Sequence, residues 1–386
     1  MANAYLDELL IEVGGFQRSL GDARFFTLWH EEYGGVRLGM ISDDGAGAAE
    51  MQQGVDYTYE LLRRRYTLST TGPWTAIRGF EVSHDRKLGT VKMTSKRLIR
   101  DGVKDLLGDE TRFRPAGPCS ADIADLQPAP LMASDEPGYE TWRDNTAWYR
   151  KAAGWAIHVN LVHMYANYTL SVLCGLCVSP CPKAIKAMKH LICWFEVNVD
   201  EGITWGGGPT DPLTPPPTDV IVELMSKEGG PKPWCLHAYA DSDLTERSRY
   251  CAIAKVNGGP VWSKSRIQPS VAVDITDSES FAYSVASIMC EVLRGKMEDM
   301  GYAHTTEQET VIGGDNDAVL RIAASASAAK RALHILRRMG HTRDLTDAHV
   351  IKGAKVPRHM NLADLGTHYV TRTDVTRLAH LLRGGV

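Results

Sequence analysis

The first ten residues do not have the pattern of a signal peptide, and the sequence has no long uninterrupted apolar run. Asp7 and Glu8 stand where a signal peptide needs a basic and then an apolar segment, which argues against secretion. The most apolar long stretch, 154–180, is interrupted by polar residues such as His158 and Asn160. Polar residues at that frequency are costly in lipid, so we predict a buried or amphipathic helical region and no membrane span.

The sequence also has little excess charge and no disulfide framework. Lys and Arg number 43 against 47 Asp and Glu, which gives a formal net charge of -4. Binding to nucleic acid through overall positive charge is therefore disfavoured, and such binding has to come from local patches. The eight cysteines are spread unevenly over 386 residues, which indicates reduced thiols. We expect an intracellular protein of the cytoplasm or nucleus.

What is present is the composition of a folded protein with more than one domain. At 386 residues the chain exceeds the size at which a single hydrophobic core stops growing. Hydrophobic residues make up 44% and charged residues 23%, as in ordinary globular proteins. Two Pro/Gly-rich stretches are predicted to be linkers. The expected segments are a first block at 1–112, a linker at 113–138, a helical middle block at 139–205, a second linker at 206–233 and a third block at 234–386.

Hydrophobic periodicity predicts a mixed α/β protein. In the first block we expect strands at 36–41, 74–83 and 89–93, and helices at 48–67 and 95–107. The middle block has apolar residues at helical spacing and is predicted to be a helical hairpin or bundle. In the third block we expect three strands (236–240, 250–256, 261–265), a long helix (278–299), a strand (310–313), two helices (316–324, 328–339), a strand (350–356) and a terminal helix. Residues 257–260, Asn-Gly-Gly-Pro, are predicted to form a hairpin turn.

Four acids of the third block stand at the ends of these predicted elements. Two end strands and two open helices; they are Asp241, Asp315, Glu279 and Asp364. Acids in such positions can converge at one edge of a sheet. Phosphodiester hydrolysis with two divalent metals needs a convergent set of this kind, because hard cations prefer oxygen ligands.

Each acid also has a purely structural interpretation. Glu279 follows Thr276 by three residues, which is a capping-box pattern. Asp315 stands where a helix N-cap is expected. Asp241 and Asp364 fit solvated turns. Only the order and placement of the four acids favour the metal interpretation.

Short motifs in the third block resemble those of a known family. They are Tyr-Ala-Asp-Ser-Asp at 239–243, Trp-Ser-Lys-Ser at 262–265 with Gln268 and Thr-Asp-Ser-Glu-Ser-Phe-Ala at 276–282, Gly-Asp-Asn at 314–316 and Asn-Leu-Ala-Asp at 361–364. They resemble, in the same order, the Asp-x-Asp, Trp-Lys-Ser…Gln…Thr-Glu-Ala-Glu-Tyr-x-Ala, Cys-Asp-Asn and Leu-Ala-Asp motifs of Copia-type LTR retrotransposon Pol polyproteins. The resemblance implies a ribonuclease H-like domain, with a mixed five-stranded sheet and flanking helices.

The resemblance also implies a function for the four acids. They would bind two Mg²⁺ or Mn²⁺ ions for endonucleolytic cleavage of the RNA strand of an RNA–DNA hybrid. Asn316 is implied to help position that strand. The chain departs from the family at Asp277-Ser278-Glu279, which replaces Glu-Ala-Glu, and in lacking Thr-Lys-Pro after the last Asp. The alternative is a decayed or repurposed fragment that binds nucleic acid or protein without catalysis.

The first block resembles the reverse transcriptase palm of the same family. The matching segments are Gly15-Phe16, Ser19, Asp22 and Phe26, then Ile41-Ser42-Asp43-Asp44 in place of Tyr-Val-Asp-Asp, and Arg78-Gly79-Phe80-Glu81-Val82 in place of Leu-Gly-Ile-Glu-Ile. This implies a palm remnant at 1–112, with Asp43 and Asp44 left from the polymerase site, and a thumb or connection at 139–205. A polar turn is the alternative for the two acids. Since 42 residues precede Asp43, the fingers and the upstream metal-binding Asp are missing, so we expect no DNA synthesis by this chain alone. Other retroelement polypeptides are the implied partners.

The middle block has a cluster of residues that suit zinc. They are Cys174, Cys177, Cys181 and His190. Thiolate and imidazole ligands fit a tetrahedral zinc site, which would make a zinc-stapled interaction module. Free cysteines packed between helices are the other interpretation.

One basic run stands out in the third block. It includes Lys330, Arg331, Arg337 and Arg338, on one predicted helix. Such a run can follow a phosphate backbone, and it comes after the third acid, where related nucleases hold the DNA strand of the hybrid. A solvated helix face is the alternative.

Overall fold

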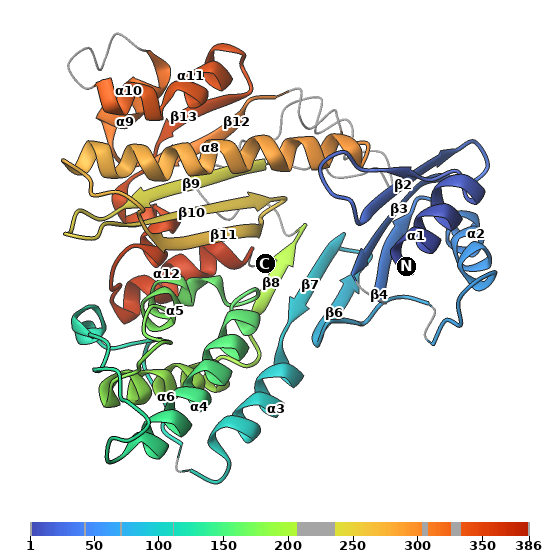
Figure 1. The fold of residues 1–386 in the computed structure, drawn as a ribbon. Helices are drawn as coiled ribbons and strands as arrows, with labels where there is room; N and C mark the ends of the chain where they lie inside the picture. Colours follow the sequence, from blue (N-terminus) through green and yellow to red (C-terminus); the bar gives the residue numbers. More distant parts are fainter. Residues whose placement is uncertain are drawn as a thin grey trace. The chain divides into compact units, whose positions relative to one another are not determined.

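The computed structural model describes residues 2–41, 44–69, 72–110, 112–206, 236–302, 308–325 and 333–384. The chain divides into two compact units, Met1–Arg78 with Glu291–Gln308, and Gly79–Cys290 with Glu309–Val386. Both units combine helices and sheets, so the predicted α/β class is confirmed (Figure 1). Residues 79–112, expected in the first block, belong to the second unit. Asp43, Lys330 and Arg331 lie outside the described residues.

The first unit is built on an antiparallel meander in the order β1-β2-β3-β4. Its elements are α1 (Ala2–Asp7), η1 (Glu8–Val13), β1 (Gln17–Arg18), β2 (Phe25–His30), β3 (Gly34–Ile41), β4 (Asp44–Ala49), α2 (Gln52–Arg63) and β5 (Ala76–Ile77). Asp44 opens β4, which pairs antiparallel with β3 and places Asp44 opposite Ile41. The helix expected from residue 48 begins only at Gln52, because the preceding residues pair in β4.

The middle of the chain is helical, as predicted. It contains α3 (Lys96–Leu107), η2 (Ala121–Asp125), α4 (Tyr139–Val159), η3 (Met164–Ala166), α5 (Asn167–Cys174) and α6 (Pro182–Val197). Apolar residues at helical spacing, among them Val159, Leu170 and Phe195, are buried in one core. The strands β6 (Phe80–Asp85), β7 (Thr90–Thr94) and β8 (Gly202–Trp205) pair antiparallel beside these helices. The single strand expected at 74–83 is interrupted, because Arg78 and Gly79 adopt positive φ angles of 50° and 86°.

A mixed five-stranded sheet follows, in the order β11-β10-β9-β12-β13. Its strands are β9 (Leu236–Ser242), β10 (Arg249–Val256), β11 (Gly259–Ile267), β12 (Thr310–Gly314) and β13 (Ile351–Lys355). The first three strands run antiparallel, whereas β12 is parallel to both β9 and β13. Asn257 and Gly258 connect β10 to β11 with φ angles of 48° and 83°, as the predicted Asn-Gly hairpin turn requires.

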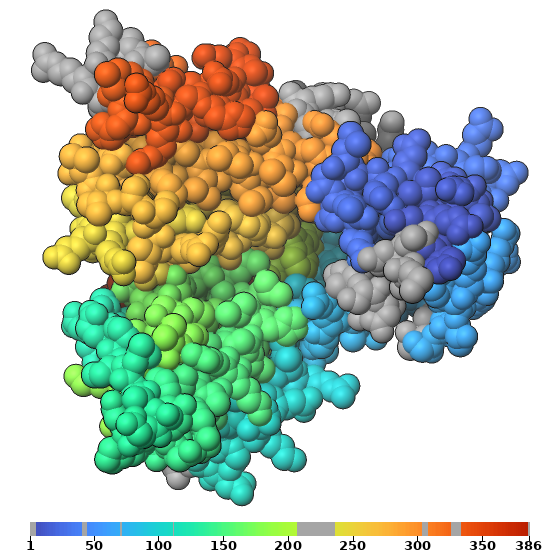
Figure 2. Space-filling model, in the orientation of Figure 1, coloured from blue at the N-terminus to red at the C-terminus, as the bar shows by residue number. Residues whose placement is uncertain are grey.

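Both faces of this sheet are covered, so β9 and β10 are buried along their whole length. On one face lies the long helix α8 (Ile275–Asp299), where Tyr250 of β10 packs against Phe281. On the other face the Lys255 ammonium donates to the Leu381 carbonyl of α12 (Arg372–Arg383). The helix α5 also packs on β11, and Figure 2 shows the green helical segment directly against the yellow strands.

The remaining elements are short helices and 3₁₀ turns that pack around the sheet. They are α9 (Asp317–Ala324), α10 (Leu333–Arg338), α11 (Gly340–Asp347), η6 (Arg358–Met360) and η7 (Leu362–Gly366). Asp364, expected to open the last helix, instead lies inside the short 3₁₀ turn η7 that precedes α12. Among the helices of the described ranges, none has the length and apolar character needed to cross a membrane.

Candidate metal centre

Strand register brings Asp241 and Asp315 together. The parallel strands β9 and β12 pair Tyr239 with Gly313. Asp241 and Asp315 each stand two residues beyond this pair, at the carboxyl ends of neighbouring parallel strands. Parallel strands end at the same edge of a sheet, so the two side chains emerge side by side.

Glu279, in the first turns of α8, completes the group. One ligand oxygen from each of Asp241, Glu279 and Asp315 lies within 4.8 Å of the other two. Among the described residues, these three acids form the one group of His, Cys, Asp or Glu side chains that is close enough to hold a metal ion. The predicted convergence of these three acids is therefore confirmed, and their donor set of carboxylate oxygens suits a hard divalent cation.

The structural alternatives for Glu279 and Asp315 are wrong, because neighbouring residues form the helix caps. At the start of α8 the Asp277 amide donates to the Asp274 carboxylate at 2.8 Å, and Asp277 in turn accepts from the Val273 amide. At the start of α9 the side-chain oxygen of Asn316 accepts from the backbone amides of Ala318 and Val319, at 2.9 and 3.3 Å. Neither Glu279 nor Asp315 is therefore used as a helix cap, and both carboxylates can bind a metal ion.

Asp364 is buried beside this group without being one of the three mutually close acids. Burial, followed by the charges of Asp241 and Asp315, raises the pKa of its carboxyl to about 8. Asp364 is therefore close enough to the three acids for their negative charges to affect its ionisation. The structure therefore brings three of the predicted acids together and sets the fourth next to them.

The electrostatics of the centre favour a bound cation. Burial, followed by the charges of Asp241 and Asp315, raises the pKa of Glu279 to about 8. Burial also raises the pKa of Asp241. The buried Oδ1 atom of Asp315 has no hydrogen-bond partner among the described residues. An unpaired buried carboxylate oxygen is costly unless a partner such as a bound ion satisfies it.

Several polar residues hold the acids in place. The Thr367 hydroxyl donates to Asp241, and the Asn316 side chain hydrogen-bonds Glu279 while its carbonyl caps α9. The Asn361 amide donates to the Ala240 carbonyl at 3.2 Å, which ties η7 to β9. Sequence reasoning missed Thr367 and assigned Asn316 to the RNA strand. The Asn-Leu-Ala-Asp motif was the one signal for Asn361.

A buried serine and glutamine network connects the two elements that carry Asp241 and Glu279. The Gln268 side-chain amide donates to the hydroxyls of Ser242 and Ser278, at 2.7 and 2.8 Å. Ser242 follows Asp241 on β9, and Ser278 precedes Glu279 on α8. The network thereby fixes the end of the strand against the start of the helix.

Arg338, predicted to contact nucleic acid, is engaged within the fold. Its guanidinium pairs with the buried Asp277 carboxylate and also donates to the Asp277 carbonyl at 2.9 Å. It also lies over the Phe281 ring, with its central carbon 5.5 Å from the ring centroid. The structure gives Arg338 a role in fixing α10 to α8, and its contact with nucleic acid stays a prediction. Arg337 is exposed.

Arg338→Ala is expected to lower the free energy of unfolding by about 2–4 kcal/mol, because it removes the guanidinium that pairs with the buried Asp277 carboxylate. Arg337→Ala is the matched control and is expected to change it by less than about 0.5 kcal/mol. Urea unfolding followed by circular dichroism measures both variants. Equal stability of the two would contradict the structural assignment of Arg338.

The four residues proposed for zinc do not converge. All four residues are described, and no three of Cys174, Cys177, Cys181 and His190 bring their ligand atoms within 4.8 Å of one another. His190 instead places its Nε2 atom 2.9 Å from the Gly117 carbonyl. Helix α6 carries His190 away from the turn that bears the cysteines, so the zinc prediction is not supported.

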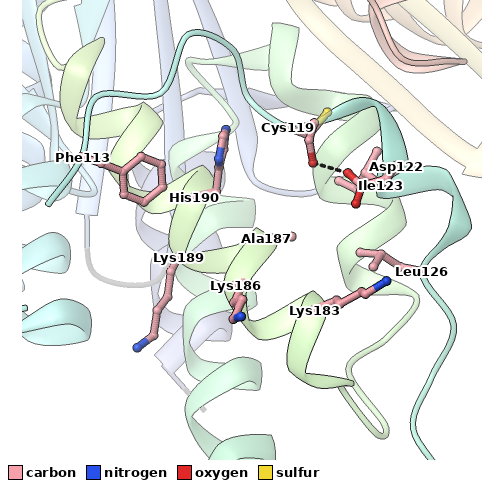
Figure 3. A pocket seen from close by; sticks show the side chains of 11 residues that line it. Phe113, Cys119, Asp122, Ile123, Leu126, Lys183, Lys186, Ala187, Lys189 and His190 are labelled. Atoms are coloured by element: carbon pink, nitrogen blue, oxygen red, sulfur yellow. Dashed lines mark hydrogen bonds between the residues drawn. The ribbon is translucent and has the colours of Figure 1, made fainter. Parts of the chain in front are cut away.

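His190 lines a pocket of about 480 Å³ between α6 and the segment 113–126. Figure 3 shows Phe113 and His190 at one end and Leu126 and Lys183 at the other. Lys183 and Lys186 lie on the α6 side. None of the acids of the metal centre lines this pocket.

Comparison with protein-family models and with curated proteins finds no match to this chain. The functional assignment therefore depends on the geometry of the acidic centre and on the motifs that carry it.

Proposed function

We propose that the chain is a reverse transcriptase and ribonuclease H fragment of a Copia-type retroelement, whose acidic centre hydrolyses the RNA strand of RNA–DNA hybrids. The observation that carries the proposal is the convergence of Asp241, Glu279 and Asp315 within 4.8 Å at the edge of a mixed five-stranded sheet. A sheet of this kind is what the resemblance implies. The protein is proposed to act inside the cell, in the cytoplasm or nucleus.

The three acids, with Asp364 beside them, are the proposed ligands of two Mg²⁺ or Mn²⁺ ions. Bound there, the ions supply an activated water and stabilisation of the leaving 3′ oxygen. The residues fit such ions, because all donors are carboxylate oxygens and Asp315 has an unpaired buried one. Thr367 orients the Asp241 carboxylate and Asn316 orients that of Glu279. Selection of the RNA strand is expected to depend on its 2′-hydroxyl groups and on the shape of the hybrid.

The test is cleavage of a hybrid whose RNA strand carries an end label. With Mg²⁺ or Mn²⁺ we expect internal cuts in the RNA strand, and none when EDTA is present. The same RNA as a single strand, and a DNA duplex of the same sequence, should stay intact. Hybrid that is bound but not cut with either metal would overturn the proposed activity in favour of a repurposed nucleic-acid-binding fragment.

A further inference from the structure

Two cysteines at the end of α5 are arranged as a vicinal pair. Cys174 is the last residue of α5, and the Cys177 amide lies 3.4 Å from the Cys174 carbonyl across a turn. A turn of this kind keeps the first and fourth Cα atoms within about 7 Å. That is the separation that a disulfide spans. Both cysteines are free thiols and half-buried.

The two thiols also affect each other's ionisation. The Cys174 thiol stabilises the Cys177 thiolate and, together with the Arg150 guanidinium, lowers the pKa of Cys177 to about 7. The reciprocal interaction with Cys177, together with burial, raises the pKa of Cys174. The pair thus has one thiol that ionises near neutral pH and one that stays protonated, which is the division between an attacking and a resolving cysteine.

The third cysteine of this region has a different role. The Cys181 sulfur accepts a hydrogen bond from the Ala184 amide at 3.3 Å and so caps the start of α6. Cys181 has an extended backbone and directly precedes Pro182, the first residue of α6. The pairing that the backbone favours is therefore between Cys174 and Cys177.

We propose that Cys174 and Cys177 form a redox-active dithiol that closes to a disulfide by exchange with a low-molecular-weight disulfide such as oxidised glutathione. The Cys177 thiolate attacks one sulfur of glutathione disulfide, whose sulfur–sulfur bond breaks, and one glutathione leaves and takes up a proton. Cys174 then loses its proton, attacks the Cys177 sulfur and displaces the second glutathione. Two protein thiols are oxidised and one glutathione disulfide is reduced to two thiols. This inference is independent of the proposed nuclease.

The test uses the full chain, treated with glutathione disulfide at pH 7.5, quenched with acid and analysed by mass spectrometry and peptide mapping. For the wild type we expect a disulfide between Cys174 and Cys177 and no retained glutathione. For Cys174→Ser we expect one glutathione held on the Cys177 sulfur, since the resolving thiol is gone. For Cys177→Ser we expect neither product on the same time scale. Cys193→Ser, which alters a buried cysteine of α6, is the control and should behave as the wild type.

A second measurement does not depend on disulfide formation. The rate of alkylation of Cys177 by iodoacetamide should rise with a midpoint near pH 7, and Cys174→Ser should move that midpoint upward. Retention of glutathione on Cys177 in the wild type, or a main disulfide that contains Cys181, would overturn the proposal. So would an alkylation midpoint that Cys174→Ser leaves unchanged.

Discussion

Replacing Asp315 by asparagine is expected to lower the rate of Mg²⁺-dependent hybrid cleavage by about a thousandfold, which corresponds to about 4 kcal/mol of transition-state stabilisation. The asparagine side chain has almost the same size as the aspartate but carries no charge. Asp315 follows β12 directly, and its buried Oδ1 is unpaired among the described residues. The variant should therefore fold as the wild type and bind the divalent ions poorly. Initial rates on labelled hybrid, together with Mn²⁺ binding by calorimetry, measure both effects.

The matched control is Asp317→Asn, only two residues further along the chain. Asp317 is exposed on α9 and pairs with Lys355 at 3.2 Å, outside the acidic group. An exposed ion pair contributes about 1 kcal/mol or less, so the cleavage rate should stay within about twofold of the wild type. If Asp315→Asn cleaves as fast as Asp317→Asn, the assignment of Asp315 to the metal centre is wrong.

The stability of the metal-free protein is expected to fall as the pH rises from about 5 to about 8. The pKa of Glu279 is raised from 4.5 to about 8, and that of Asp364 from 3.8 to about 8, in both cases chiefly by burial. The folded protein therefore keeps protons that the unfolded chain has already released. This contribution to stability is fully present below the unfolded pKa values and is lost as the pH rises through the folded ones. After allowance for solvent screening and coupling between the two groups, we expect a loss on the order of 3 kcal/mol.

Thermal unfolding in EDTA at several pH values measures this loss. Glu279→Gln should reduce the slope of stability against pH, because the substituted side chain no longer titrates. Mg²⁺ should raise the unfolding temperature more at pH 8 than at pH 6, since fewer protons must then be displaced. A flat profile in EDTA, with the same Mg²⁺ effect at both pH values, would count against a cluster of buried acids.

The sequence predicted the parts of the metal centre that depend on local order. Asp241 and Asp315 end strands, and the element order placed these strands in one sheet. Glu279 lies in the first turns of α8, a helix that the spacing of apolar residues in the sequence predicted. The Asn257-Gly258 turn followed from the preference of that pair for positive φ, which the structure has.

The parts that the sequence could not predict depend on distant partners or on competition between neighbours. Arg338 pairs with Asp277, which lies 61 positions earlier, and no local pattern encodes that contact. Two adjacent acids or amides can both cap a helix, so sequence alone could not decide between Asp315 and Asn316. The turn η7 is short and buried, and its residues have no helical periodicity that would separate Asp364 from the start of α12.

The acidic centre collects its side chains from β9, α8 and the end of β12, which are far apart along the chain. In an unfolded or partly folded chain these carboxylates are far apart, and a single carboxylate binds a divalent ion only weakly. The ion therefore recognises only the finished sheet. During refolding, tight Mn²⁺ uptake should therefore coincide with the pairing of β12 with β9, and the bound metal reports when that pairing forms.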